Sequence, residues 1–173
     1  MRQKPHKTPR KAVIAVSGTP GTGKTALARK LSLLLKMHRM DVDRYIGTHH
    51  LYTGYDQQRK TRIVPLKPLR RSLAAYIRES ERSLIVDSHL AHCLPPALVD
   101  AVIITACDIR VLQRRLQKRG YNPLKIRENL DAEIFDTCGT EAQEAGHLRI
   151  LRVDTTRRPS IPTLARKIRK ILC

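Results

Sequence analysis

The sequence has no tryptophan, a single phenylalanine, and only 3 % aromatic residues over its 173 positions. Aliphatic side chains must therefore build the core, as they do in a parallel sheet that is covered by helices on both faces. No apolar run approaches the ~18 residues of a membrane-spanning helix, so no membrane association is expected. The length suits one domain of the usual ~100–200 residues, which here spans residues 1–173.

Paired cysteines are also lacking. The four cysteines are scattered and form no CxxC pair: Cys93, Cys107, Cys138 and Cys173. This pattern favours free buried thiols over a disulfide or a structural metal site. His89, His92 and Cys93 lie close together in the sequence, but as metal ligands they would compete with the phosphate chemistry described below.

Acidic residues are scarce, with 15 Asp and Glu against 34 Lys and Arg, a net charge of +19. Catalysis on ATP needs only a few local cations, so the excess favours a polyanionic partner, RNA in particular, over a surface that is merely basic. The cations gather in residues 110–127 and in a C-terminal group: Arg157, Arg158, Arg166, Lys167, Arg169 and Lys170. A solvated helix face explains this last group equally well.

A complete GxxxxGKT phosphate loop follows the apolar segment at residues 12–17 and opens an amphipathic segment at residues 24–37. Glycines allow a tight turn whose N–H groups approach phosphate oxygens, the lysine supplies a cation for the β and γ phosphates, and the hydroxyl that follows is a ligand for Mg²⁺. The candidate ATP-binding residues are Gly18, Gly21, Thr22, Gly23, Lys24, Thr25 and Ala26. Cleavage of the basic residues 1–11 together with this run as a signal peptide would remove the site, so a cytoplasmic protein is expected, also nuclear if its source is eukaryotic.

Short apolar runs alternate with helical patterns along the rest of the chain, which predicts an α/β fold with a parallel sheet. The expected strands are residues 12–17, 43–46, 84–87, 101–105 and 148–153. The expected helices are residues 24–37, 66–79, 109–118, 123–137 and 160–171.

A second half of the site is expected where the run Leu84–Asp87 ends. A phosphate loop needs a carboxylate at the end of a neighbouring strand to hold the metal and its water shell, and Asp87 meets this need. Asp87 and Thr25 are thus the candidate Mg²⁺ residues, with Asp87 acting through water. His89 leaves the same strand end and is a candidate for orienting a nucleophile, although a lone histidine is often structural.

Phosphoryl transfer also needs cations that neutralise charge on the transferred group. Arg115 and Arg119 are four residues apart on the expected helix 109–118, and Gly120 follows directly as a hinge. Both arginines are therefore candidate catalytic residues, the alternative being exposed arginines on a basic helix.

Three segments together, GTPGTGKT, LIVDSH and RLQKRGYNPLKIRENLDAEI, resemble the adenylate kinase isoenzyme-six type, the family of the coilin-interacting nuclear ATPase protein and archaeal broad-specificity NMP kinases. LYTGYD at residues 51–56 is similar to the family's NMP-side segment. The resemblance covers residues 12 to 153 approximately.

The resemblance implies a three-layer P-loop NTPase fold with a five-stranded parallel sheet, an NMP-binding flap at residues 45–64 and a short lid at residues 118–128. It implies reversible phosphoryl transfer from ATP to an AMP-like acceptor, with an ATPase activity. It also implies a role in late small-ribosomal-subunit maturation, through transient binding of an S-eleven family ribosomal protein. By position, Asp87 and His89 match the family's Asp-x-His motif, Arg119 matches the lid arginine, and Arg115 precedes it.

The chain departs from the family between Gly47 and Tyr52, where no arginine is present for the acceptor phosphate. The basic stretch that follows offers Arg59, Lys60 and Arg62 as substitutes. Two other functions remain open: another small-molecule kinase, of the dephospho-coenzyme A or shikimate kinase type, and a nucleotide-gated clamp for a ribosomal protein or RNA that turns over little ATP.

Overall fold

Strand β1 (Val13–Ser17) is buried along its whole length, because it lies in the middle of a sheet that is covered on both faces. The computed structural model describes residues 11–172. In it, β1 pairs in parallel with β5 (Leu84–Asp87) and β6 (Ala101–Ala106). The edge strands are β2 (His38–Asp41) and β7 (Ile150–Asp154), which gives the order β2-β5-β1-β6-β7. The predicted five-stranded parallel sheet is thereby confirmed.

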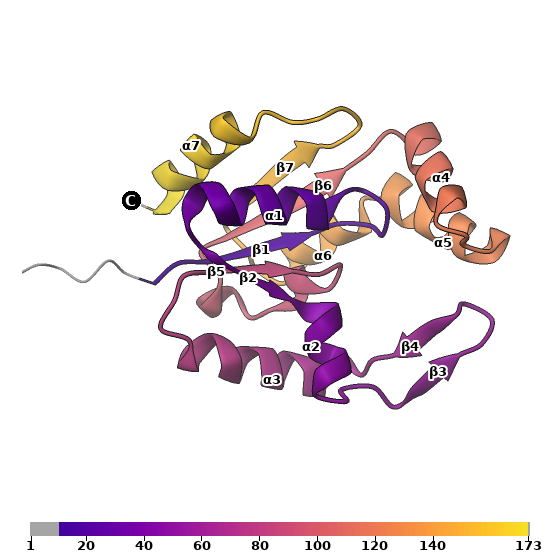
Figure 1. Ribbon diagram of the computed structural model, residues 1–173, viewed down its shortest axis with the longest axis horizontal. Helices are drawn as coiled ribbons and strands as arrows, with labels where there is room; N and C mark the ends of the chain where they lie inside the picture. The colour runs from indigo at the N-terminus through magenta and orange to yellow at the C-terminus, as the bar shows by residue number, and fades with distance from the viewer. Residues whose placement is uncertain (1–10, 173) are drawn as a thin grey trace, which may run out of the picture.

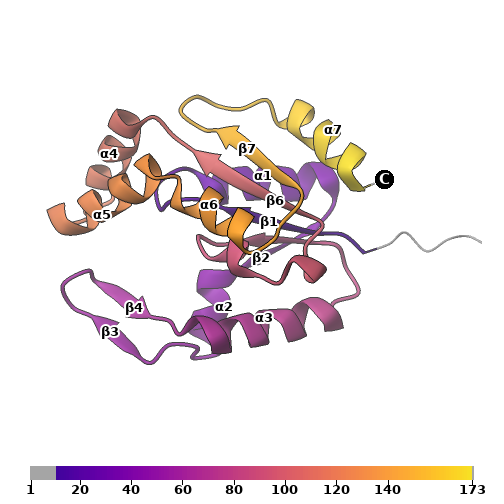
Figure 2. The ribbon, with the colours of Figure 1, turned by 180° about the vertical axis from the view of Figure 1, so that it is seen from behind.

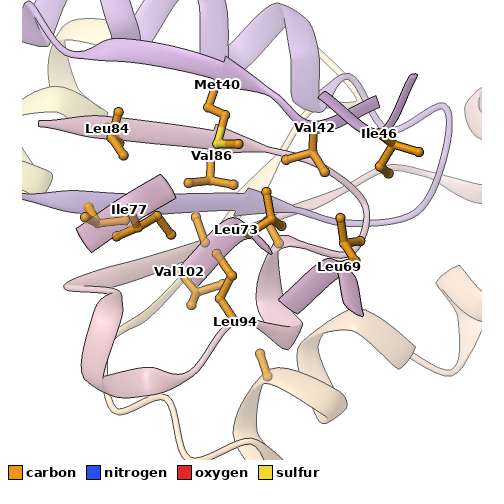
Figure 3. Close-up of a cluster of buried hydrophobic side chains, with 14 of the residues drawn as sticks. Met40, Val42, Ile46, Leu69, Leu73, Ile77, Leu84, Val86, Leu94 and Val102 are labelled. Carbon is orange, nitrogen blue, oxygen red and sulfur yellow. The ribbon is translucent and has the colours of Figure 1, made fainter. Parts of the chain in front are cut away.

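Helices cover the two faces of this sheet (Figures 1 and 2). Helices α1 (Lys24–Leu35) and α7 (Ile161–Leu172) pack on one face, where Leu27, Leu31 and Ile168 are buried. Helices α3 (Leu66–Glu79) and α6 (Thr137–Glu144) pack on the other, together with the short 3₁₀ helices η1 (Ala91–Cys93) and η2 (Pro96–Leu98). Figure 3 shows this second cluster, in which aliphatic side chains and Met40 form the buried part.

Two segments extend from the sheet on the same side of the molecule (Figure 1). The first is helix α2 (Val42–Thr48), followed by the antiparallel hairpin of β3 (Gly54–Asp56) and β4 (Thr61–Ile63). The second is helix α4 (Ile109–Lys118), followed by α5 (Pro123–Ile134). They overlap in sequence with the expected flap at residues 45–64 and the expected lid at residues 118–128.

The strand expected at residues 43–46 is wrong. The helix before it ends at Leu35 rather than at residue 37, because Lys36 adopts a left-handed conformation with φ of 55°. The chain then forms β2 five residues earlier than expected. Asp41 ends that strand and caps α2, its carboxylate accepting a hydrogen bond from the Arg44 amide at 3.1 Å.

The helix expected at residues 123–137 is also wrong in part. It ends at Ile134, Asp136 takes a left-handed conformation with φ of 49°, and a separate helix α6 begins at Thr137. Two other elements are displaced by smaller amounts. Strand β7 begins two residues later than expected, and helix α7 begins one residue later than expected.

Three elements of the structure were not expected from the sequence: the β3–β4 hairpin and the two 3₁₀ helices. The predicted basic tail, apart from Lys11, and the predicted free thiol of Cys173 lie outside the described residues. Among residues 11–172 no helix has the length and hydropathy needed to cross a bilayer.

Candidate active site

The phosphate loop links β1 to α1 and follows the predicted design. Gly18 approaches strand β6 so closely that a Cβ atom would lie 2.5 Å from the Thr105 carbonyl oxygen. Gly23 has φ of 91° and starts α1 without a capping side chain. The first residues of α1 therefore present their N–H groups at a positive helix end, which suits an anion.

Thr22 has a supporting position in this loop. Its side chain is fully buried, donates to the Thr19 carbonyl at 2.7 Å and lies 2.6 Å from the Thr105 hydroxyl. The Thr22 hydroxyl thus ties the loop to β6 and is not available to a phosphate.

A cavity of about 890 Å³ opens at the carboxyl ends of the strands. Lys24 lies in its wall, with Nζ donating to the Thr19 carbonyl at 3.1 Å. Burial lowers the pKa of Lys24 to about 8, and the Asp87 carboxylate acts in the opposite direction. The side chain is therefore charged at neutral pH, and a bound phosphate would raise its pKa further.

Asp87 is held at the end of β5 by two donors. The Thr25 hydroxyl donates to Oδ1 at 3.4 Å, and the Arg39 guanidinium donates to Oδ2 at 2.6 Å. Burial raises the pKa of Asp87, while the hydrogen bond from Arg39 opposes this shift. Thr25 and Asp87 thus offer adjacent hydroxyl and carboxylate oxygens, the donor set that suits Mg²⁺.

Arg39 is a site residue that the sequence analysis missed. It also pairs with Asp41 at 3.0 Å, so one guanidinium links two strand ends. Correct placement of β2 would have revealed it, because Asp41 and Asp87 are register partners and Arg39 is two residues before Asp41.

His89 lines the cavity and is neutral at physiological pH. Burial, aided by the charge of Lys24, lowers its pKa to about 4. A neutral imidazole beside the phosphate loop can accept a hydrogen bond from water or a hydroxyl.

The two predicted arginines are separated in the structure. Arg119 ends α4 and lines the cavity, next to Gly120 with φ of 70°. Arg115 is not among the cavity residues. Its guanidinium donates to the Thr155 carbonyl at 2.8 Å and to Cys107 Sγ at 3.2 Å, so it fixes the end of β7 against α4.

The hairpin and α5 meet over the cavity through Arg59 and Glu128. The Arg59 guanidinium contacts both carboxylate oxygens, at 2.6 Å to 3.0 Å. Lys125 adds a hydrogen bond to the Arg59 carbonyl at 3.0 Å. We call the Arg59–Glu128 pair the flap–lid bridge. It engages one of the three cations that were considered for the acceptor phosphate.

Arg62 is the second of those cations, and it lines the cavity. Its guanidinium lies 5.0 Å from the centre of the Tyr52 ring and beside Gly47, close to Asp43 on α2. Lys60, the third, is exposed at the hairpin turn and is not among the cavity residues.

Comparison with known proteins agrees with this geometry. A family model described as AAA domain (AAA_18) matches residues 14–136. A Methanocaldococcus jannaschii protein named "Putative adenylate kinase" is 34% identical over 145 residues, 84% of this chain and 77% of that protein. A Caenorhabditis elegans protein named adenylate kinase isoenzyme 6 homolog is 31% identical over 138 residues, 80% and 76% of the two chains.

A solved structure shares the fold at lower identity. Shikimate kinase from Acinetobacter baumannii, in complex with shikimate, superposes with a TM-score of 0.59 at 18% identity over 95% of this chain and 94% of that chain. This likeness concerns the fold alone.

Proposed function

Because this chain belongs to the family of the archaeal and isoenzyme 6-type adenylate kinase homologues, we propose that it transfers the γ-phosphoryl group of ATP to the phosphate of an AMP-like nucleotide. The observation that carries the proposal is the lining of one cavity by two sets of groups. Gly23, Lys24 and Thr25 of the phosphate loop lie on one side, and Arg62 and Asp43 of the flap segment lie on the other.

The chain's own residues account for donor binding. The N-terminal amides of α1 and the Lys24 ammonium hold the β and γ phosphates in line with the acceptor side. Arg119 stands at the cavity rim, where it can neutralise charge that spreads onto the transferred group. Thr25 and Asp87 would hold Mg²⁺, which supplies Lewis-acid stabilisation of the phosphates when it is bound.

Arg62 takes the role of the missing acceptor arginine. Arg59 is already paired with Asp56 and Glu128, whereas Arg62 has a cation–π contact with Tyr52 and lines the cavity. A guanidinium can bind a phosphate through two parallel hydrogen bonds, which fixes the acceptor's orientation as well as its position.

ATPase activity in the absence of an acceptor is part of the same proposal. Neutral His89 and the carboxylate of Asp87 leave the same strand end and both line the cavity. His89 orients a water in the place of the acceptor phosphate and accepts a hydrogen bond from it as it attacks.

The test compares the KM for AMP with the KM for ATP in a variant of Arg62. Arg62→Ala is expected to raise KM for AMP by about 10- to 100-fold, the worth of a charge-assisted hydrogen bond, and to leave KM for ATP unchanged. Lys60→Asn, which removes a neighbouring cation outside the cavity and suits the left-handed backbone at that position (φ of 48°), is the matched control. Equal KM values for AMP in both variants would reject Arg62 as the acceptor residue.

A hydroxyl-bearing acceptor is the second candidate, and Asp41 and Asp43 favour it. Both carboxylates line the acceptor side of the cavity, and carboxylates bind sugar-like hydroxyl groups well. An acceptor panel of nucleoside monophosphates, shikimate and gluconate decides between the two by showing which compound receives the phosphoryl group.

We also propose a role for this turnover in late small-subunit maturation, with an S-eleven family ribosomal protein and rRNA as partners. The net charge of +19 supports a polyanionic environment. The proposal predicts that the ribosomal protein, alone or with rRNA, changes the rate of ATP turnover. A partner that binds without any change in rate would instead favour the nucleotide-gated clamp.

A further inference from the structure

A cluster of three side chains lies behind the phosphate loop and is not part of the kinase chemistry. His92 and Cys93 belong to η1, and Glu141 belongs to α6. One ligand atom from each lies within 4.8 Å of the other two. His92 is buried, Cys93 is partly buried and Glu141 is exposed, so solvent reaches the cluster from the α6 side.

The hydrogen bonds of Ser17 hold the His92 ring in place. The buried Ser17 hydroxyl lies 3.1 Å from the His89 carbonyl oxygen and 2.7 Å from His92 Nδ1. When this hydroxyl donates to the His89 carbonyl, its oxygen accepts from Nδ1–H, and the other ring nitrogen, Nε2, has the lone pair that a metal ion needs.

Nε2 faces a carboxylate. His92 Nε2 lies 2.6 Å from Glu141 Oε2, and either a proton on Nε2 or a metal ion can join these two atoms. A serine hydroxyl on Nδ1 is the type of outer partner that orients a histidine toward a metal.

A hydrogen bond also holds the backbone of η1 in place. His147 Nε2 lies 2.9 Å from the His92 carbonyl oxygen, and this hydrogen bond joins η1 to the segment that follows α6. Glu141 in contrast has a half-exposed side chain that can move. Tetrahedral zinc with bonds of ~2.0–2.3 Å separates its ligand atoms by roughly 3.3–3.7 Å, so Glu141 Oε2, now 2.6 Å from His92 Nε2, would move about 1 Å away from it to admit the ion.

We propose that His92 Nε2, Cys93 Sγ and a Glu141 carboxylate oxygen form a zinc-binding site, with water as the fourth ligand. Nitrogen, sulfur and oxygen donors together suit Zn²⁺ rather than Mg²⁺, which prefers oxygen alone. The ion would tie α6 to the segment that follows β5 and contains His89.

The site does not compete with ATP, contrary to the expectation from the sequence. That expectation grouped His92 and Cys93 with His89, which lines the cavity. Glu141, 49 residues away from His92 in the sequence, replaces His89 as the neighbour, and His92, Cys93 and Glu141 are not among the residues that line the cavity.

Cobalt binding tests the proposal, because Co²⁺ replaces Zn²⁺ and is coloured. Tag-free, chelator-treated protein is titrated with Co²⁺ and then with Zn²⁺. We expect one equivalent of Co²⁺ to give a thiolate-to-cobalt charge-transfer band and tetrahedral d–d bands, both abolished by Zn²⁺. The spectrum should be lost in Cys93→Ser and the affinity should fall at least tenfold in Glu141→Gln.

Two controls identify the ligands. Cys107→Ser removes a thiol in a different cluster, and Asp87→Asn removes a ligand of the ATP site; both should keep the spectrum. Glu141→Gln changes an exposed side chain, so its folding, checked by circular dichroism, should match the wild type. Absence of stoichiometric Co²⁺ binding, or a charge-transfer band that persists in Cys93→Ser, would overturn the proposal.

Discussion

His89 follows Asp87 by two residues on the chain and lines the same cavity as Lys24. Its Nδ1 and Nε2 are uncharged at neutral pH, since burial lowers its pKa to about 4. A group of this kind is a poor anchor for a phosphate, which needs a cation, but its unprotonated ring nitrogen can accept a hydrogen bond from water and so orient it. Its contribution should therefore appear in the chemical step.

We predict that His89→Ala lowers kcat for ATP hydrolysis by about 100-fold while the Kd for ATP changes by less than about threefold. Pre-steady-state hydrolysis and nucleotide binding by calorimetry measure the two quantities separately. The control is Ser80→Ala, which lies after α3 and outside the cavity. His92→Ala would be unsuitable, because its ring is buried. An equal loss of ATP binding and of ATP turnover would contradict a role of His89 in the chemical step.

The same residue makes stability depend on pH. The pKa of His89 falls from its ordinary value of 6.5 to about 4 on folding. Between these values the unfolded chain binds a proton that the folded chain does not, so stability decreases as pH drops from 6.5 toward 4, by up to about 3 kcal/mol. Urea unfolding of wild type and His89→Gln over this range measures the difference. Parallel curves would contradict a neutral buried His89.

At the scale of elements, the flap–lid bridge joins the hairpin to α5, two segments that we propose separate when nucleotides exchange. The bridge is bidentate, which makes it stronger than most exposed ion pairs, whose worth is about 0–1 kcal/mol. It favours the closed arrangement of the hairpin and α5. In kinases of this kind, opening for product release often limits turnover.

Glu128→Gln is accordingly expected to raise KM for both nucleotides and kcat together, by about two- to fivefold, with weaker dependence on salt. Arg127→Ala, which removes a long 4.0 Å pair with Asp131 on the exposed face of α5, is the matched control. Unaltered kinetics in Glu128→Gln would show that the bridge does not control opening.

Elements with a strong local signal were predictable from the sequence. The apolar run of β5 and the helical spacing of α3 and α4 gave bounds that the structure confirms. Strand β2 was missed because it is a polar edge strand, His38–Asp41, that pairs on one side only and so lacks an apolar pattern. Helix α6 was missed because its sequence TCGTEAQE contains weak helix formers.

Contacts between distant residues were not predictable. Arg59 and Glu128 are 69 residues apart, and His92 and Glu141 are 49 apart. No local pattern marks either pair. The phosphate loop and Asp87 were found because spacing and strand ends alone define them, whereas Arg39 depended on placing β2 correctly.

At the scale of the whole molecule, charge is the property that the kinase chemistry leaves unexplained. The net charge is +19, and the outer face of α7 has four cations. One of them, Arg169, donates to the Leu34 carbonyl at 3.2 Å and so fixes α7 against α1. The other three, Arg166, Lys167 and Lys170, are exposed.

We predict salt-dependent binding to structured RNA through these three residues. Substitution of all three by Gln should weaken binding and reduce the slope of log K against log salt by about 2–3, since each phosphate contact contributes about 0.7–0.9. ATP turnover without RNA should not change, because the residues lie outside the cavity. An unchanged slope would mean that α7 is only a solvated face.

The central claim is phosphoryl transfer between nucleotides, and phosphorus NMR of ATP with AMP tests it most directly. The account predicts that AMP and ATP disappear together and become ADP, with little inorganic phosphate, and that Lys24→Ala abolishes the change. Release of inorganic phosphate at the same rate with and without AMP, while AMP persists, would contradict a kinase and leave an ATPase.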